Sequence, residues 1–172
     1  LKGKKGMKEL GVAMSKTFSP GNIASAAIGR SFELALAQDK ALVALNKSTG
    51  AANLYGKQLV DLEDKLWDQG ISVENAGAAL TSMVHGFRDF KSVSKSSQNE
   101  MIETAAVLEK MGISSATTTK NMESMVAVFG MSGPAAAAAN RELFTLAQDI
   151  GMATTDMIEG FNQAGPRLAK FG

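Results

Sequence analysis

The sequence has no cysteine and a single histidine, His85. Without cysteine the chain can form neither a disulfide framework nor a thiolate metal site. One histidine also argues against a zinc or iron centre built on imidazole ligands. No apolar run approaches the roughly 20 residues that a membrane-spanning helix needs.

Aromatic side chains are few, at 6% of residues, whereas alanine is abundant. Alanine lets helices approach closely, but it buries little area, and burial stabilises by roughly 25 cal/mol per Å². A chain of 172 residues is long enough for one domain with a real core. We therefore expect a modest core that neighbouring copies of the chain help to complete.

Charge is distributed unevenly along the chain. Residues 1–20 hold five lysines and one glutamate, about +4, and the remainder holds 13 basic and 16 acidic residues, about −3. Residues 1–21 are expected to form a basic leader, poorly ordered because Gly3, Gly6 and Gly11 interrupt any long helix. This leader is either a solvated chain end or a tether to nucleic acid or an acidic surface. Its one aromatic residue, Phe18, gives little support for base stacking, so sequence-specific nucleic-acid binding is not expected.

A short glycine joint recurs through the second half of the chain. It reads Gly-Ile-Ser at 70–72 and 112–114, Gly-Met-Ser at 130–132 and Gly-Met-Ala-Thr at 151–154. Glycine accepts the left-handed conformation that ends a helix, and the apolar residue after it can pack back on that helix. The hydroxyl residue can then cap the next helix. The pattern predicts a string of helices joined by very short turns.

Apolar residues between these joints recur with helical spacing. One helix is expected from Ile23 to about Asn46, between a Pro20-Gly21 turn and a break at 48–50. The next is expected over about 51–69. The apolar side of the first helix is expected to comprise Phe32, Ala35, Leu36, Leu42 and Val43. The later helices are expected to bury Tyr55, Leu59, Leu62, Leu66, Ala76, Leu80, Met83, Phe87, Phe90, Met101, Ala105, Leu108, Met111, Thr118, Met122, Met125, Phe129, Ala136, Ala139, Leu143, Leu146, Ile150, Met157, Ile158 and Phe161.

Three local signals refine this division. Residues 91–97 read as a polar hinge, with Ser97 and Glu100 as a capping box. Pro134 suits the first turn of a helix. Gly165-Pro166 is expected to end the last helix.

The fold class predicted from these patterns is all-α. About six or seven amphipathic helices joined by Gly-x-Ser turns form an array or bundle that oligomerisation completes, and no period-two alternation predicts a sheet. Three parts are expected: the leader over 1–21, an alanine-rich helix over 22–50 and a multi-helix body over 51–172.

No catalytic, cofactor-binding or metal-ligating residue is predicted. Residues 50–58 resemble a phosphate-binding loop, but Gln58 stands where a hydroxyl must reach Mg²⁺ and no strand precedes it. The carboxylates of Glu100, Glu103 and Glu109, or of Asp61, Asp64 and Asp68, are interpreted as solvated helix faces. His85 is interpreted as a surface or packed residue and Trp67 as a core or interface residue. Since no nucleophile–base pair or metal cluster is visible, an enzyme is not expected.

Methionine is unusually frequent, with ten residues, eight of them after residue 80. Two interpretations stay open. The methionines either fill irregular gaps in a core or form a surface that repacks among partners, because the unbranched thioether adapts to both.

Several stretches resemble the tail tape-measure proteins of contractile-tailed phages. The likeness covers roughly residues 40–172 and is carried by the stretches 45–50, 87–96, 106–114, 130–133, 141–149 and 164–172. It rests on the order of helices, joints and small motifs rather than on a catalytic signature.

The resemblance implies a structural virion component. Such proteins are long helical chains that fill the tail tube, usually as three or six copies, set tail length during assembly and leave ahead of the DNA. The implied partners are further copies of this chain as a homotrimer or homohexamer, tail-tube and baseplate-hub proteins, and for some members the host membrane. The implied localisation is the tail lumen or baseplate hub.

This chain departs from that family in lacking a long heptad coiled coil, a membrane span and a peptidoglycan-hydrolase motif. A straight helix of 172 residues would reach about 260 Å, and the joints shorten it greatly. Since it begins with Leu1 and no signal peptide follows, we expect a fragment of a longer chain, near one end, that contacts tube or hub proteins. A generic helical scaffold or adaptor and a membrane-active helical protein remain alternatives.

Overall fold

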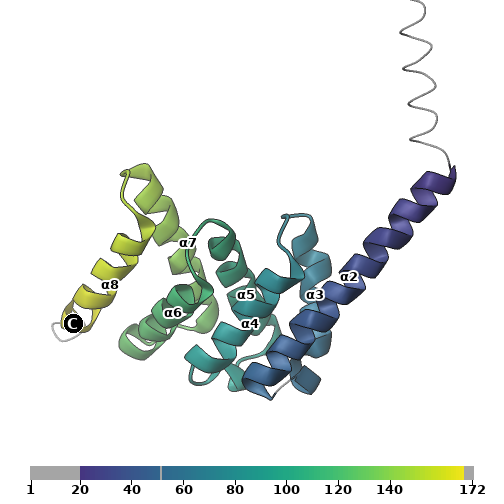
Figure 1. Ribbon diagram of the computed structural model, residues 1–172. Coiled ribbons are helices and arrows are strands. Elements are labelled where there is room, and N and C mark those ends of the chain that lie inside the picture. The colour runs from purple at the N-terminus through teal and green to yellow at the C-terminus, as the bar shows by residue number, and fades with distance from the viewer. Residues whose placement is uncertain (1–19, 51, 169–172) are drawn as a thin grey trace, which may run out of the picture. The chain divides into compact units, whose positions relative to one another are not determined.

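The computed structural model describes residues 20–50 and 52–168, and within these residues the protein is helical throughout, with no strand (Figure 1). The elements in chain order are α2 (Pro20–Thr49), α3 (Ala52–Trp67), α4 (Val73–Gly86), the 3-10 turn η1 (Phe90–Ser92), α5 (Lys95–Lys110), α6 (Ser115–Phe129), α7 (Gly133–Asp149) and α8 (Thr154–Leu168). The all-α prediction is confirmed for this part of the chain. The leader expected over residues 1–21 lies almost entirely outside the described residues.

Helix α2 is longer than the sequence predicted. Its first residue is Pro20, so the expected turn there is wrong, because proline at a first helical position has no N–H that needs a partner. The expected break at 48–50 is confirmed at Gly50, where φ is +64° and the helix has ended, but Ser48 and Thr49 still belong to α2. The hydroxyls of Ser48 and Thr49 donate to the carbonyl of Leu45 at 3.1 and 2.6 Å, within the last turn. The chain divides into two compact units, residues 1–39 and 40–172, and the boundary falls inside this helix.

The glycine joints are helix ends and helix starts, as predicted. Gly70, Gly112, Gly130 and Gly151 all have positive φ, between 64° and 94°. After the first two, Ile71 and Ile113 are buried, and their N–H groups return to Leu66 and Leu108 at 3.2 and 2.9 Å.

The hydroxyl residues of the first three joints cap the helices that follow. The side chains of Ser72, Ser114 and Ser132 accept from the backbone N–H three residues on, at 3.1 to 3.3 Å. The fourth joint differs, because Thr154 is itself the first residue of α8.

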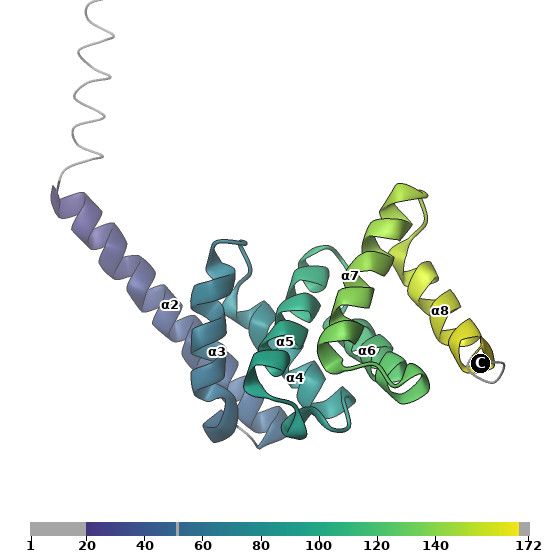
Figure 2. The same cartoon turned by 180° about the vertical axis from the view of Figure 1, so that it is seen from behind.

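Within residues 40–172 the helices build an open array. Each of α3 to α6 packs against the next helix in the chain and the next but one, and α7 packs against α8. The array therefore extends in one direction, from residues 40–49 of α2 and α3 to α8, as the two views show (Figure 1, Figure 2).

The predicted seams are buried from α3 through α5. The side chains of Tyr55, Leu59, Leu62 and Leu66 on α3 are at most 4% exposed, and Leu80, Met83, Met101 and Leu108 are at most 2% exposed. Four predictions fail here. Ala35, Leu36 and Val43 on the expected apolar side of α2 are exposed, whereas Leu45, which falls off that side, is fully buried. Met111 is also exposed, because it follows the last residue of α5 and lies beyond the core.

Two local predictions are corrected near α5 and α8. Helix α5 begins at Lys95 and its cap is Ser94, whose Oγ accepts from the N–H of Ser97, so the capping box at 97 and 100 is not formed. Pro166 lies inside α8 and does not end it. The preceding residue, Gly165, has no Cβ to clash with the proline ring, and only the last helical turn loses a hydrogen bond. Pro134 lies in the first turn of α7, as expected.

Candidate functional site

Two of the acidic residues singled out in the sequence, Glu100 and Glu103, form ion pairs between helices. Glu103 of α5 binds Lys65 of α3 at 2.6 Å, and Glu100 binds Arg141 of α7 at 3.3 Å. Arg141 also donates to the hydroxyl of Thr104. In the part of the chain that the structure describes, no three His, Cys, Asp or Glu residues are grouped to hold a metal ion. These carboxylates position α3 and α7 on either side of α5.

The other candidates for chemistry are also structural or solvated. Gln58 is buried, and its Nε2 donates to Asn99 on α5, so this side chain does not face a phosphate. His85 is exposed near the end of α4. Trp67 is 61% exposed at the end of α3 and is therefore not a core residue.

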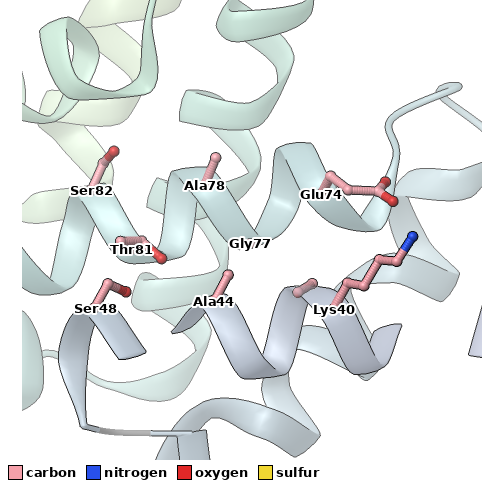
Figure 3. Close-up of a pocket in the computed structure, with 9 residues that line it drawn as sticks. Lys40, Ala44, Ser48, Glu74, Gly77, Ala78, Thr81 and Ser82 are labelled. Atoms are coloured by element: carbon pink, nitrogen blue, oxygen red, sulfur yellow. The ribbon is translucent and has the colours of Figure 1, made fainter. Parts of the chain in front are cut away.

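A shallow groove runs between the second half of α2 and α4, with a volume of about 550 Å³. Figure 3 shows Lys40 and Glu74 at one end and Ser48, Thr81 and Ser82 toward the other. Its floor is a seam of small side chains, where a Cβ added to Gly77 would lie 3.4 Å from the Cβ of Ala41. This seam explains the close approach of the two helices. It offers serine and threonine hydroxyls without a histidine base, so it has no arrangement for nucleophilic catalysis.

A second groove, which we call the C-terminal groove, lies among α6, α7 and α8 and has a volume of about 460 Å³. Its lining residues are Met125, Phe129, Met131, Ala139, Glu142, Leu143, Leu146 and Phe161. Glu142 is the one charged residue among them. Phe129 and Leu146 are 40% and 48% exposed, and Ile150, one turn beyond Leu146 on α7, is 57% exposed. The groove therefore continues an apolar strip that is open to solvent.

A buried amide pair holds the walls formed by α6 and α7 together. Asn121 of α6 donates from Nδ2 to Oδ1 of Asn140 at 2.8 Å. Asn140 donates in turn to the carbonyl of Ala136 at 2.8 Å and contacts the sulfur of Met125 at 3.6 Å. Both asparagines have no exposed surface. The pair fixes the facing sides of α6 and α7 and places Met125 at the base of the groove.

Aromatic packing attaches α8 to the same wall. The rings of Phe129 and Phe161 are 5.5 Å apart between centroids and tilted by 40°. Phe129 also lies against Gly165, where an added Cβ would come within 3.2 Å of the ring. Glycine at this position lets the ring lie flat against the last turns of α8.

The part of the chain that holds the second half of α7 and most of α8 contains several acidic residues. Between residues 142 and 166 the chain has four carboxylates and no lysine or arginine. These are Glu142, Asp149, Asp156 and Glu159, and all four are exposed. Of these four, Glu142 is the one that lines the groove, and the exposed residues Arg141 and Arg167 lie directly before and after this stretch.

The sequence predicted the groove residues as apolar but placed them in the core. Met125 is buried as expected, whereas Phe129, Leu146 and Ile150 are exposed. Helical spacing shows which side of a helix is apolar, but not whether another helix follows to cover it. Met83, Met101, Met122 and Met125 are buried in the core, whereas Met111 and Met152 are exposed. A surface that repacks among partners stays a prediction.

Comparison of the chain with known protein families, with curated proteins and with solved structures found no match. Among the described residues, none of the helices combines the length and the apolar character that crossing a membrane requires.

Proposed function

We propose that this chain is a structural section of a phage tail tape-measure protein that acts through contacts with other proteins and not through catalysis. The observation that carries the proposal is the C-terminal groove, with the exposed apolar side chains of Phe129, Leu146 and Ile150 along it. Its lining has one charged group, whereas small-molecule sites place several polar groups to orient the ligand. An open apolar strip with a polar rim is typical of a surface that packs against another protein.

The identity of the assembly comes from the sequence resemblance over residues 40–172, which marks this array as part of a longer helical chain in the tail tube or hub. There it helps to set tail length and leaves the tube when DNA is ejected. A helical array joined by four short glycine joints suits this role, because each joint is a point at which neighbouring helices can change their angle.

Virions made by the genome that encodes this chain provide the test. Quantitative mass spectrometry of purified tails should find peptides of this chain at three or six copies per tail. After DNA release is triggered, the particles should have lost most of them. Absence from the tails, or full retention after ejection, would contradict the proposal. A tail protein of known copy number serves as the internal standard.

A membrane-active role is the second candidate, favoured by the exposed side chains of Leu146, Ile150 and Met152. A liposome leakage assay distinguishes the membrane-active role from the tail role. The membrane role predicts dye release by the intact chain that Leu146→Lys with Ile150→Lys abolishes. A Leu54→Lys variant is the matched control, because Leu54 is equally apolar and 61% exposed but lies on α3. No release by the intact chain above that of a scrambled chain excludes this role and leaves the tail role standing.

A further inference from the structure

Helix α8 is attached to the array through apolar side chains. Ile158 has no exposed surface and packs with Leu108 and Ile113, and the half-buried ring of Phe144 lies against this cluster. A second attachment is the aromatic pair between α6 and α8 described above. Among the described residues of α8, no side chain forms a hydrogen bond or an ion pair with another helix.

Polar ties, in contrast, fix each of the helices from α3 to α7. The hydroxyls of Ser82 and Ser115 are 3.2 Å apart between α4 and α6. The amide and ion pairs described above join α3 to α5, α5 to α7 and α6 to α7. Hydrogen bonds require a defined geometry, whereas apolar packing is non-directional. Helix α8 can therefore leave its place without breaking a polar tie, and Oδ1 of Asn162, buried there without a partner, then gains water.

The chain before and within α8 also favours its release. Gly151 in the joint has φ +69°, and a Cβ added to it would meet nothing within 4 Å. Ile150 and Met152 on either side of it are 57% and 44% exposed, so the joint is little packed against the array. Within the helix, Gly160 and Gly165 lower helix propensity. A loosely packed joint before a helix that depends on tertiary contacts marks an element of low local stability.

We propose that α8 exchanges between copies of the chain, leaving its own α6 and α7 and docking at the same surface of a neighbouring copy. The occupant follows from the contacts already present, because the exchanged helix again buries Ile158 and again places Phe161 on Phe129. Exchange of an identical element joins copies at low cost, since no new complementary surface is needed. The copies also meet along the opened joints, where Ile150 and Met152 can be covered.

The exchange closes as a reciprocal pair or as a ring in which each α8 docks on the next copy. The inference does not depend on the tail role, because it uses only the contacts that α8 makes within the chain.

The length of the joint provides the first test. Only residues 150–153 connect Asp149 to Thr154, and the chain must reverse direction there for α8 to pack on its own α7. Deleting Gly151 and Met152 prevents this reversal but leaves α8 and its docking surface unchanged. Inserting Gly-Ser-Gly-Ser after Met152 makes the reversal easier.

Sedimentation velocity over a concentration series measures the association of both variants and the parent. The deletion should tighten association at least tenfold and the insertion should weaken it at least tenfold. A deletion variant that stays monomeric, or equal association of the three chains, would overturn the inference.

Cross-linking tests the contact itself, and the absence of cysteine makes it clean. One preparation of the full chain carries Phe129→Cys and a second carries Phe161→Cys, at positions whose rings are 5.5 Å apart. The two are mixed, incubated and treated with a short bis-maleimide. The matched control replaces Phe129→Cys with Ala116→Cys, an exposed position in the first turn of α6.

The inference predicts a cross-linked pair between separate chains at a yield at least fivefold above the Ala116→Cys control. Equal yields in the two mixtures, or no product in either, would overturn it. Product confined to a chain that carries both substitutions would overturn it as well, since α8 would then stay on its own chain.

A substitution at the buried anchor separates docking of α8 from general stickiness. Ile158→Ala on the Phe161→Cys chain should reduce the yield severalfold, whereas Leu54→Ala, at a 61% exposed position on α3, should leave it unchanged. A yield indifferent to Ile158→Ala contradicts the inference. If α8 does not exchange but the chain is found in tails at three or six copies, this inference fails and the proposed function stands.

Discussion

The buried amide pair between α6 and α7 gives the sharpest prediction for stability. Asn140→Ala removes the 2.8 Å bonds to Asn121 and to the carbonyl of Ala136, each worth about 1 kcal/mol net. It also leaves Nδ2 of Asn121 buried without a partner, which costs a further 1 to 3 kcal/mol or so. We expect the free energy of unfolding to fall by about 3 kcal/mol.

Asn121→Ala should cost less, about 1.5 kcal/mol, because Oδ1 of Asn121 is already buried without a hydrogen-bond partner and its removal relieves that penalty. The double variant should lose less than the sum of the two by about 1 kcal/mol or more, since the second substitution removes a group that the first left unpaired. Urea denaturation followed by circular dichroism at one protein concentration measures the stability of the parent, the two single variants and the double variant. Additive losses, or an Asn140→Ala variant within about 0.5 kcal/mol of the parent, would refute this reading of the pair.

Four further substitutions test two glycines, a helix cap and Tyr55. Gly112→Ala should destabilise by about 1 to 2 kcal/mol, because φ is +94° there although nothing lies within 4 Å of the added Cβ. Gly160→Ala, equally unobstructed but helical, should instead stabilise by about 0.5 to 1 kcal/mol in the same melting assay. Ser114→Ala should cost about 1 kcal/mol, because it removes the 3.1 Å cap of the Thr117 N–H. Burial raises the pKa of Tyr55, so the folded state favours the neutral phenol. The stabilisation that the neutral phenol of Tyr55 contributes is complete below about pH 10 and is lost as pH rises further. Tyr55→Phe should therefore reduce the loss of folding stability above pH 10, and an unchanged pH dependence of stability would contradict this prediction.

The joints and the central seams were predictable because their causes are local. Each joint depends only on neighbouring residues: a glycine with positive φ, and a serine whose side chain accepts from the backbone N–H three residues later. The joints at 70–72 and 112–114 therefore form as expected. The helix boundaries were less predictable from the sequence. Ser48 and Thr49 read as a break, yet their hydroxyls find the carbonyl of Leu45 inside the helix.

The C-terminal groove was not predictable in the same way. Leu146 and Ile150 have the spacing of buried residues, but their exposure depends on how many helices follow α7 and where α8 lies. The amide pair was missed for a related reason. Asn121 and Asn140 are 19 residues apart, and nothing local marks two asparagines as partners.

The mass of the intact chain in solution tests the central claim, that the open apolar surface of α7 and α8 packs against another copy. Multi-angle light scattering should find a trimer, a hexamer or a concentration-dependent series, and Leu146→Lys should shift it to monomer while Leu54→Lys leaves it unchanged. A stable monomer at every concentration, or an assembly that both variants leave intact, would contradict the claim.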